Sequence, residues 1–99
     1  MKWCEAFIQM KETNAFVRRK TWPQNYFIWY KPEAKVLESW CKDSNLKKVI
    51  NKYGKFNDNK EKFINCEDVF CLYDGFRVKT GFEIIRGDRY SEDWEIVEL

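Results

Sequence analysis

The chain has 99 residues, of which 18 are basic and 16 acidic, for a formal net charge of +2. This length predicts a single domain over residues 1–99 with a modest core. The balanced charge argues against a dedicated duplex-binding protein, and no apolar run is long enough for a membrane-spanning helix. Glu5 and Gln9 interrupt the stretch that would be apolar in a signal peptide, which predicts a cytoplasmic protein.

The counts of aromatic residues, cysteines and histidines further limit the possible functions. Five Trp, five Tyr and eight Phe are more than a small core can hide, so we expect some at a ligand site or a subunit contact, and hence an oligomer. The four cysteines form no Cys-x-x-Cys pair and there is no His, which disfavours a metal site. We expect four reduced, mostly buried thiols.

The N-terminal third predicts a helix, two strands and a loop. Apolar residues at helical spacing predict a helix over 3–12, followed by a short strand over 15–18. Pro23 and Asn25 favour a loop over 21–25. The run 26–30 predicts the strongest strand, with both faces apolar. Such a strand is typical of a sheet centre covered on both sides, or of a subunit interface.

The middle of the chain predicts one helix between less regular segments. Residues 36–40 form a short apolar segment of uncertain type. A helix is expected over 44–53, capped by Asp43, Ser44 or Asn45 and ended by Gly54. The polar segment 55–62 is expected to be a mobile loop.

The C-terminal third predicts a hairpin, a helical turn and a last strand. Asp74-Gly75 between the β-rich runs 68–73 and 76–80 is a hairpin signal. Asp88 is expected to cap a helical turn over 89–93, and a strand follows over 94–97. The sum is an α+β fold: a small antiparallel sheet of about four or five strands with two packed helices.

A candidate site lies where cations precede an indole. Arg18-Arg19-Lys20 comes just before Trp22, and cations bind phosphates while an indole face stacks on a base. Strand alternation puts Arg18 and Lys20 on one face and Arg19 on the other. Alone, three cations usually form a solvated edge and one Trp usually lies in a core; together, on a loop leaving a strand, they favour a site.

Catalysis is hard to build from these residues. Without His, a Ser or Cys nucleophile lacks its usual base, and the chain has no glycine-rich phosphate loop. The carboxylates Asp88, Glu92 and Asp93 are best explained by helix capping and surface charge. We therefore expect binding without turnover, with no cofactor and no metal.

Several motifs, in order, resemble a family of short phage and prophage proteins. That family opens with an aromatic-x-Glu-Ala-Leu helix and a Val-x-Arg-x-x-Trp segment, and closes with Asp-x-x-x-x-Asp-Trp-Glu-Ile-Val. Some longer members add a middle Trp-Cys-Lys-Asp and a later Thr-Gly-Trp. The matching segments here are 3–11, 17–22, 40–43, 80–82 and 88–97.

The family includes the second type of Thoeris anti-defence protein, and the resemblance implies its properties. These sponges bind cyclic ADP-ribose signals without cleaving them, form homotetramers with pockets between subunits, and in some members also hold cyclic dinucleotides at a separate site. The resemblance implies a non-enzymatic phage protein in the cytoplasm of the infected bacterium. It would sequester a cyclic nucleotide messenger as a homo-oligomer, with a tetramer favoured over a dimer, and would engage neither membrane nor nucleic acid.

The resemblance also implies ligand-binding residues. Trp22 would stack on the purine, Arg18 would contact phosphate or hold the loop, and Phe82, standing where the family has Trp, would be a second wall. Asp88 would accept from ribose hydroxyls or cap its helix. Further lining and contact residues would be Phe7, Tyr26 and Arg86.

One segment departs from the family pattern. Glu83-Ile84-Ile85-Arg86-Gly87 replaces a small polar stretch that borders the family's pocket. Arg86 is then expected to supply a new phosphate contact to a different ligand, or the pocket is lost and the scaffold blocks a protein. The alternative function is therefore direct inhibition of a host defence protein through exposed aromatic residues. Single-strand nucleic-acid binding and hydrolysis of the signal are weaker alternatives.

Overall fold

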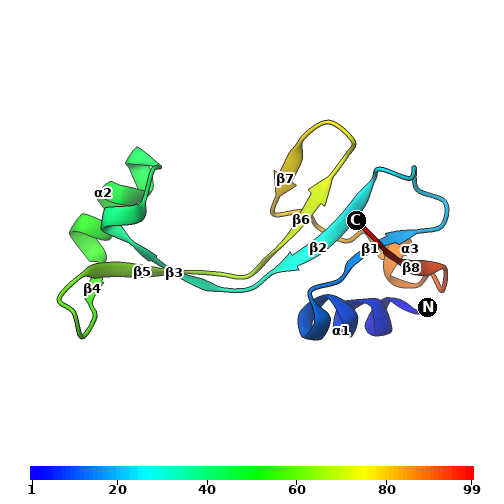
Figure 1. Ribbon diagram of the computed structural model, residues 1–99, viewed down its shortest axis with the longest axis horizontal. Coiled ribbons are helices and arrows are strands. Elements are labelled where there is room, and N and C mark those ends of the chain that lie inside the picture. The colour runs from blue at the N-terminus through cyan, green and yellow to red at the C-terminus, as the bar shows by residue number, and fades with distance from the viewer. The chain divides into compact units, whose positions relative to one another are not determined.

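The computed structural model describes residues 1–99, which form two compact units (Figure 1). Unit 1 comprises residues 1–32 and 69–99, and unit 2 comprises residues 33–68. Unit 2 is thus an insertion in the sequence of unit 1. None of the helices combines the length and the apolar character needed to cross a bilayer.

Unit 1 is built on a five-stranded antiparallel sheet in the order β7-β6-β2-β1-β8. β2 is the central strand of this sheet, which agrees with one part of the first of the two arrangements expected from its apolar faces. All five strands predicted in this part of the chain are present, displaced by a residue or two at their ends. The strands are β1 (Phe16–Arg19), β2 (Phe27–Lys31), β6 (Val69–Tyr73), β7 (Val78–Thr80) and β8 (Trp94–Val97).

The core of unit 1 lies between one face of this sheet and α1 (Trp3–Thr13), which confirms the N-terminal helix. Ala6 and Met10, one turn apart on α1, are fully buried. The register pairs Val17 with Ile28, and Ile28 with Leu72, so these side chains share the face that α1 covers. Burying aliphatic side chains of this size stabilises a fold by about 1.5–3 kcal/mol each.

The opposite face of the sheet carries a cluster of aromatic rings, here called the aromatic face: Phe16, Phe27, Trp29 and Tyr73. Their ring centroids lie 5.5–6.2 Å apart, in the range of favourable aromatic pairs. Both helices of unit 1 lie on the core side of the sheet. α1 packs on it, and α3 (Arg86–Arg89) contacts the side chain of Arg19 there. No helix of unit 1 covers the aromatic face.

The hairpin between β6 and β7 forms as predicted. The Asp74 carboxylate accepts hydrogen bonds from the backbone N–H groups of Phe76 and Arg77, at 2.9 and 2.8 Å. Gly75 has a φ of 89°, a conformation that a residue with a Cβ adopts at a cost. A Cβ there would also lie 2.6 Å from the Asn25 amide nitrogen.

Unit 2 contains a second, three-stranded antiparallel sheet in the order β3-β5-β4, which the sequence patterns did not reveal. The segment of uncertain type is β3 followed by a 3₁₀ helix, η1. Residues 55–62, expected to be a loop, contain β4 and the first residue of β5, because pairing with β5 outweighs the polar composition. The bounds are β3 (Ala34–Leu37), η1 (Glu38–Trp40), β4 (Lys55–Phe56) and β5 (Lys62–Cys66).

The helix of unit 2, α2 (Ser44–Tyr53), has the predicted ends. The Asp43 carboxylate accepts from the backbone N–H groups of Asn45 and Leu46, and Gly54 follows the last turn. The helix packs on β5 of the three-stranded sheet, whereas the sequence analysis expected both helices to pack on one sheet. A Cβ on Gly54 would collide with the carbonyl groups of Ile50 and Phe63, which explains glycine where α2 meets β5.

The four cysteines are free, but their burial differs from the expectation. Only Cys71, on central strand β6, is buried, whereas Cys4 is exposed on α1 and the other two are half-buried.

Candidate functional site: a groove beside Arg18

A groove of about 680 Å³ opens in unit 1 beside β1 and β8. Its volume lies within the roughly 300–1,000 Å³ typical of small-molecule sites. The lining combines a guanidinium, two carboxamides, two carboxylates and apolar surface. The lining residues are Arg18, Gln24, Asn25, Phe27 and Glu95–Leu99.

The strand register brings Arg18 into this groove. Val17 pairs with Ile28 in the antiparallel β1–β2 ladder, so the same register sets Arg18 opposite Phe27, an aromatic-face residue. On the other side, Arg18 pairs with Glu95 of β8. The separation of Arg18 from Arg19 by strand alternation is confirmed, because Arg19 shares the core-side face with Val17 and Trp94.

Two contacts orient the Arg18 guanidinium. Its Nε donates to Glu95 Oε1 at 2.9 Å, and one Nη1 donor reaches the Pro23 carbonyl at 3.4 Å. A guanidinium has five N–H donors in a fixed plane, so three remain for a ligand. The Arg18 side chain is 22% exposed, so the pair is partly shielded from water.

The charge of the groove constrains what it can hold. Besides Arg18 it contains the carboxylates of Glu95 and Glu98. A phosphate would have to lie on the Nη side of Arg18, away from Glu95, while hydroxyl and amino groups of the same ligand can donate to the carboxylates. The carboxamides of Gln24 and Asn25 can both donate and accept. Such a lining suits a ligand that carries both acidic oxygens and many donors.

Trp22, the predicted stacking residue, lies outside this lining. Its half-buried ring meets Tyr26 at 5.0 Å and Trp94 at 5.2 Å, edge-on in both cases. It packs against the core of unit 1 and thereby anchors the turn between β1 and β2. The structure brings Trp22 and Tyr26 together, but their role in binding remains a prediction.

Phe7 and Phe82 also pack against the core of unit 1. Phe7 lies among aromatic rings, 5.7 Å from Phe70 and 6.0 Å from Tyr30, under the ammonium of Lys11. Both predicted lining residues therefore have structural neighbours on the α1 side of the sheet, whereas Arg18 is on the other side.

Asp88 does not cap the last helix, contrary to one of its two predicted roles. The N-cap of α3 is Ile85, and Asp88 lies inside the helix because the turn begins earlier than expected, at Arg86. Asp88 is 7% exposed and accepts from Arg19 Nη1 at 2.9 Å. Its backbone carbonyl accepts from the indole N–H of Trp94 at 2.9 Å. These contacts tie α3 to β1 and β8.

Asp93 completes the same network. It accepts from Arg19 Nε at 2.9 Å and from Nη2 at 3.2 Å. These hydrogen bonds lower the pKa of Asp93 and raise the pKa of Arg19. Arg19, which the sequence placed in a cationic run, is thereby explained by its structural pairing.

Arg86, the residue expected to add a phosphate contact, is exposed on α3. Its guanidinium lies 5.8 Å from the ring centre of Tyr90, a cation–π distance. It does not line the groove beside Arg18.

The sequence patterns missed most of the groove. Of the seven predicted ligand residues only Arg18 lines it; the residues not foreseen include Gln24, Asn25, Phe27 and Glu95. Strand alternation in the sequence could have indicated part of this groove, because it places Arg18 and Phe27 on the sheet face opposite the core. The register that makes them neighbours depends on the length of the turn between β1 and β2, which periodicity does not supply.

A family model for the Tad2-like, or Thoeris anti-defense 2-like, domain matches residues 1–97. The chain belongs to the Thoeris anti-defense 2-like family. The match includes both compact units, so unit 2 lies within the matched region. A search of curated protein sequences gives no match. Membership supports a role in countering Thoeris defence.

Proposed function

We propose that this protein is a sponge: in the cytoplasm of an infected bacterium it binds a cyclic nucleotide immune messenger and holds it without cleaving it. The messenger is of the cyclic ADP-ribose type, or a cyclic dinucleotide. The family match supports the anti-defence role, and the observation that carries the ligand class is Arg18, with free donors, in a groove of about 680 Å³.

The chemistry of the groove fits such a ligand. A cyclic ADP-ribose presents a pyrophosphate, which suits the Nη groups of Arg18, and ribose hydroxyls, which can donate to Glu95 or Glu98. Capturing a submicromolar messenger requires a binding free energy of about −8 to −12 kcal/mol. Aromatic stacking adds about 1–3 kcal/mol per base where a ring face is free, but Phe27, the ring that lines the groove, is only 8% exposed, so the polar contacts at Arg18 would supply most of the binding.

The test measures thermal stability of the full chain with a cyclic ADP-ribose and with a cyclic dinucleotide. We expect one of them to raise Tm and to be recovered intact, by mass spectrometry, after the protein is denatured. Arg18→Gln should weaken binding at least about tenfold, the effect of losing a charge-assisted hydrogen bond. Lys20→Gln is the matched control, because Lys20 is exposed and does not line the groove.

Two results would overturn the proposal. Recovery of cleaved messenger would show that the protein is an enzyme. No change in Tm with either class of messenger would show that the protein does not bind these ligands. Equal binding by Arg18→Gln and the wild-type protein would place the site elsewhere.

We also propose that the protein acts as a homo-oligomer, a tetramer or a dimer, assembled through the aromatic face. Trp29 and Phe16 of this face are half-buried, Val78 beside them is 53% exposed, and no helix of unit 1 lies over them. The groove borders this face through Phe27. Light scattering after size exclusion tests the proposal: we expect a multiple of the 12.1 kDa chain mass, and a monomer at micromolar concentration would contradict it.

Direct inhibition of a host protein is the second candidate, because large apolar side chains are exposed outside the aromatic face. Trp40 is 76% exposed in unit 2 and Phe76 is 82% exposed in the β6–β7 hairpin. A stable complex with a host defence protein, formed equally by Arg18→Gln and lost in Trp40→Ala, would favour this function over the sponge.

A further inference from the structure

The small sheet of unit 2 leaves one side of its central strand, β5, partly free. β3 pairs with β5 from Phe63 to Cys66, whereas β4, on the other side, has two residues and pairs only with Phe63 and Lys62. The chain before β4 is Gly54 and α2, so no strand continues along residues 64–66 on that side. Such an edge presents backbone N–H and C=O groups with which another strand can pair.

A cavity of about 160 Å³ lies at this free edge. Tyr53, in the last turn of α2, is 68% exposed there, although Ile50 one turn earlier is fully buried. The volume is below the roughly 300–1,000 Å³ of small-molecule sites, so the cavity suits a single side chain better than a whole ligand. The lining residues are Tyr53, Lys55, Phe63, Ile64 and Asn65.

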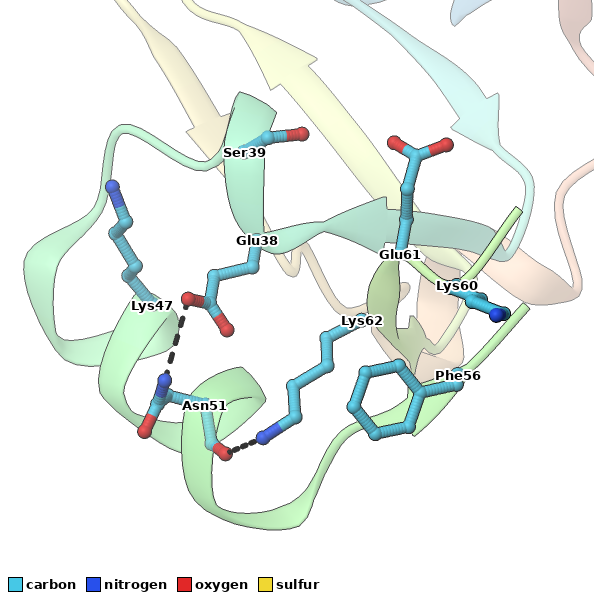
Figure 2. Close-up of a pocket in the computed structure, with 8 residues that line it drawn as sticks. All are labelled: Glu38, Ser39, Lys47, Asn51, Phe56, Lys60, Glu61 and Lys62. Carbon is cyan, nitrogen blue, oxygen red and sulfur yellow. Dashed lines mark hydrogen bonds between the residues drawn. The ribbon is translucent and has the colours of Figure 1, made fainter. Parts of the chain in front are cut away.

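The two faces of the small sheet use their lysines differently. Figure 2 shows Lys62 of β5 directed toward α2, where its ammonium donates to the Asn51 carbonyl. Strand alternation puts Phe63 on the opposite face, and the register puts Lys55 beside it. Lys35 shares that face, since it pairs with Asn65, two residues after Phe63. These two lysines therefore lie on the face that α2 does not cover.

Cations surround the cavity and have no acidic partner. The Lys52 ammonium lies 5.5 Å from the ring centre of Tyr53, and the Lys35 ammonium lies 5.0 Å from that of Phe63, both cation–π distances. Lys55 lines the cavity itself, and no carboxylate does. None of the three lysines forms an ion pair within the chain. An apolar hollow with cations around it suits an apolar side chain flanked by acidic groups.

Two other occupants fit this edge less well. A second copy of the chain would bring the lysines of two identical edges together, which is unfavourable. A nucleic acid would attract the lysines, but its sugar–phosphate backbone has no amide groups to pair with a strand. An extended peptide has those groups at the required spacing.

We propose that the free edge of β5 binds an extended, acidic segment of a partner protein by strand addition. An apolar side chain of that segment, opposite Ile64, would enter the cavity beside Tyr53. The next side chain, a carboxylate opposite Asn65, would lie on the open face near Lys55 and Lys35. The site lies within unit 2, shares no residue with the groove beside Arg18, and does not depend on messenger binding.

The experiment measures binding of a labelled synthetic peptide to the full chain by fluorescence anisotropy. In this peptide Glu and Asp alternate with Val and Ile, so that one side is acidic and the other apolar. We expect saturable binding and slower amide hydrogen exchange at residues 64–66. A peptide with the same side chains but N-methylated backbone amides should bind at least about tenfold more weakly, because it cannot donate along the edge.

Side-chain variants test the cavity and the lysines separately. Tyr53→Ser removes the ring and should weaken binding about tenfold or more; a Tm measurement without peptide checks that this exposed change leaves the fold intact. Lys35→Gln combined with Lys55→Gln should weaken binding about three- to tenfold, the effect of two exposed ion pairs. Lys47→Gln combined with Lys48→Gln is the matched control, an equal charge change on α2 outside this cavity.

The absence of saturable binding would overturn the proposal, and so would undiminished binding by Tyr53→Ser or of the N-methylated peptide. Equally tight binding of polyglutamate or of an oligonucleotide would show a site for negative charge alone. A change of oligomeric state in Tyr53→Ser would show that a second copy occupies the edge. Arg18→Gln should bind the peptide as the wild-type protein does, so failure of the messenger test leaves this site standing.

Discussion

Arg19 and Asp93 form a two-point ion pair, with Nε to Oδ1 at 2.9 Å and Nη2 to Oδ2 at 3.2 Å. The remaining nitrogen of Arg19 bonds to Asp88 of α3 at 2.9 Å. One guanidinium thus connects β1, the start of β8 and α3. Because β8 is an edge strand that lines the groove, this connection holds one wall of the candidate site.

Replacing Arg19 with Lys should lower the stability of unit 1 and weaken ligand binding only indirectly. A lysine ammonium cannot reproduce the planar contact to Asp93 while also reaching Asp88. We expect a lower urea midpoint than for Lys20→Arg, a conservative change at the neighbouring exposed cation. Equal midpoints for the two variants would show that the network contributes little.

Acid should destabilise the protein through Asp93 and Asp74. The pKa of Asp93 is lowered by hydrogen bonds from Arg19, and that of Asp74 by the backbone N–H groups of Arg77 and Phe76. A carboxyl whose folded pKa lies below its unfolded value stabilises the fold above the unfolded pKa, about 3.9. That stability is lost as pH falls through the lower folded value.

Urea unfolding between pH 7 and pH 2.5 measures this loss. Below about pH 4 the free energy of unfolding should decrease as the pH is lowered. This decrease with pH should be smaller in Asp93→Asn. An unchanged slope in that variant would contradict the assignment.

Gly75→Ala should destabilise the β6–β7 hairpin by about 1–2 kcal/mol, the cost of a Cβ in a left-handed conformation. The new Cβ would also press on the Asn25 amide, 2.6 Å away, at the rim of the groove. Gly87→Ala is the matched control, since a Cβ there meets nothing within 4 Å. In thermal melts, Gly75→Ala should have a lower Tm than Gly87→Ala.

Asp43→Ala should destabilise α2 by about 1 kcal/mol, because Asp43 caps its N-terminus. The loss should appear as faster amide hydrogen exchange within residues 44–53. Asp58→Ala removes an exposed aspartate from the β4–β5 turn and should leave exchange in α2 unchanged. Similar exchange in both variants would show that the cap is not needed.

Trp22→Ala should abolish messenger binding if the indole stacks on the purine. The same change removes ring contacts with Trp94 and Tyr26, so it should also destabilise unit 1 by about 3 kcal/mol. Trp22→Leu separates the effects by keeping an apolar side chain against the core without a ring that can stack. Binding that survives in Trp22→Leu would assign Trp22 a structural role.

Local patterns predicted those elements whose cause lies within a few residues. The helix over 3–12, a helix N-cap within 43–45, the Gly54 end and the Asp74-Gly75 turn are each determined by neighbouring side chains and backbone preferences. The second sheet was missed because β4 has only two residues and β5 begins in a lysine-rich segment. Neither has a periodicity of its own, and both exist because they pair with each other and, through β5, with β3.

The sequence by itself determined the α+β class, the presence of a strand near 26–30 and, through its motif order, the family. These follow from local chemistry and from residue order. Only the tertiary structure decided that Arg18 lines a groove with Asn25 and Glu95 while Arg19 is committed to Asp88 and Asp93. Which side chains meet across a sheet depends on strand register and turn length, and these are set by the packing of the whole unit.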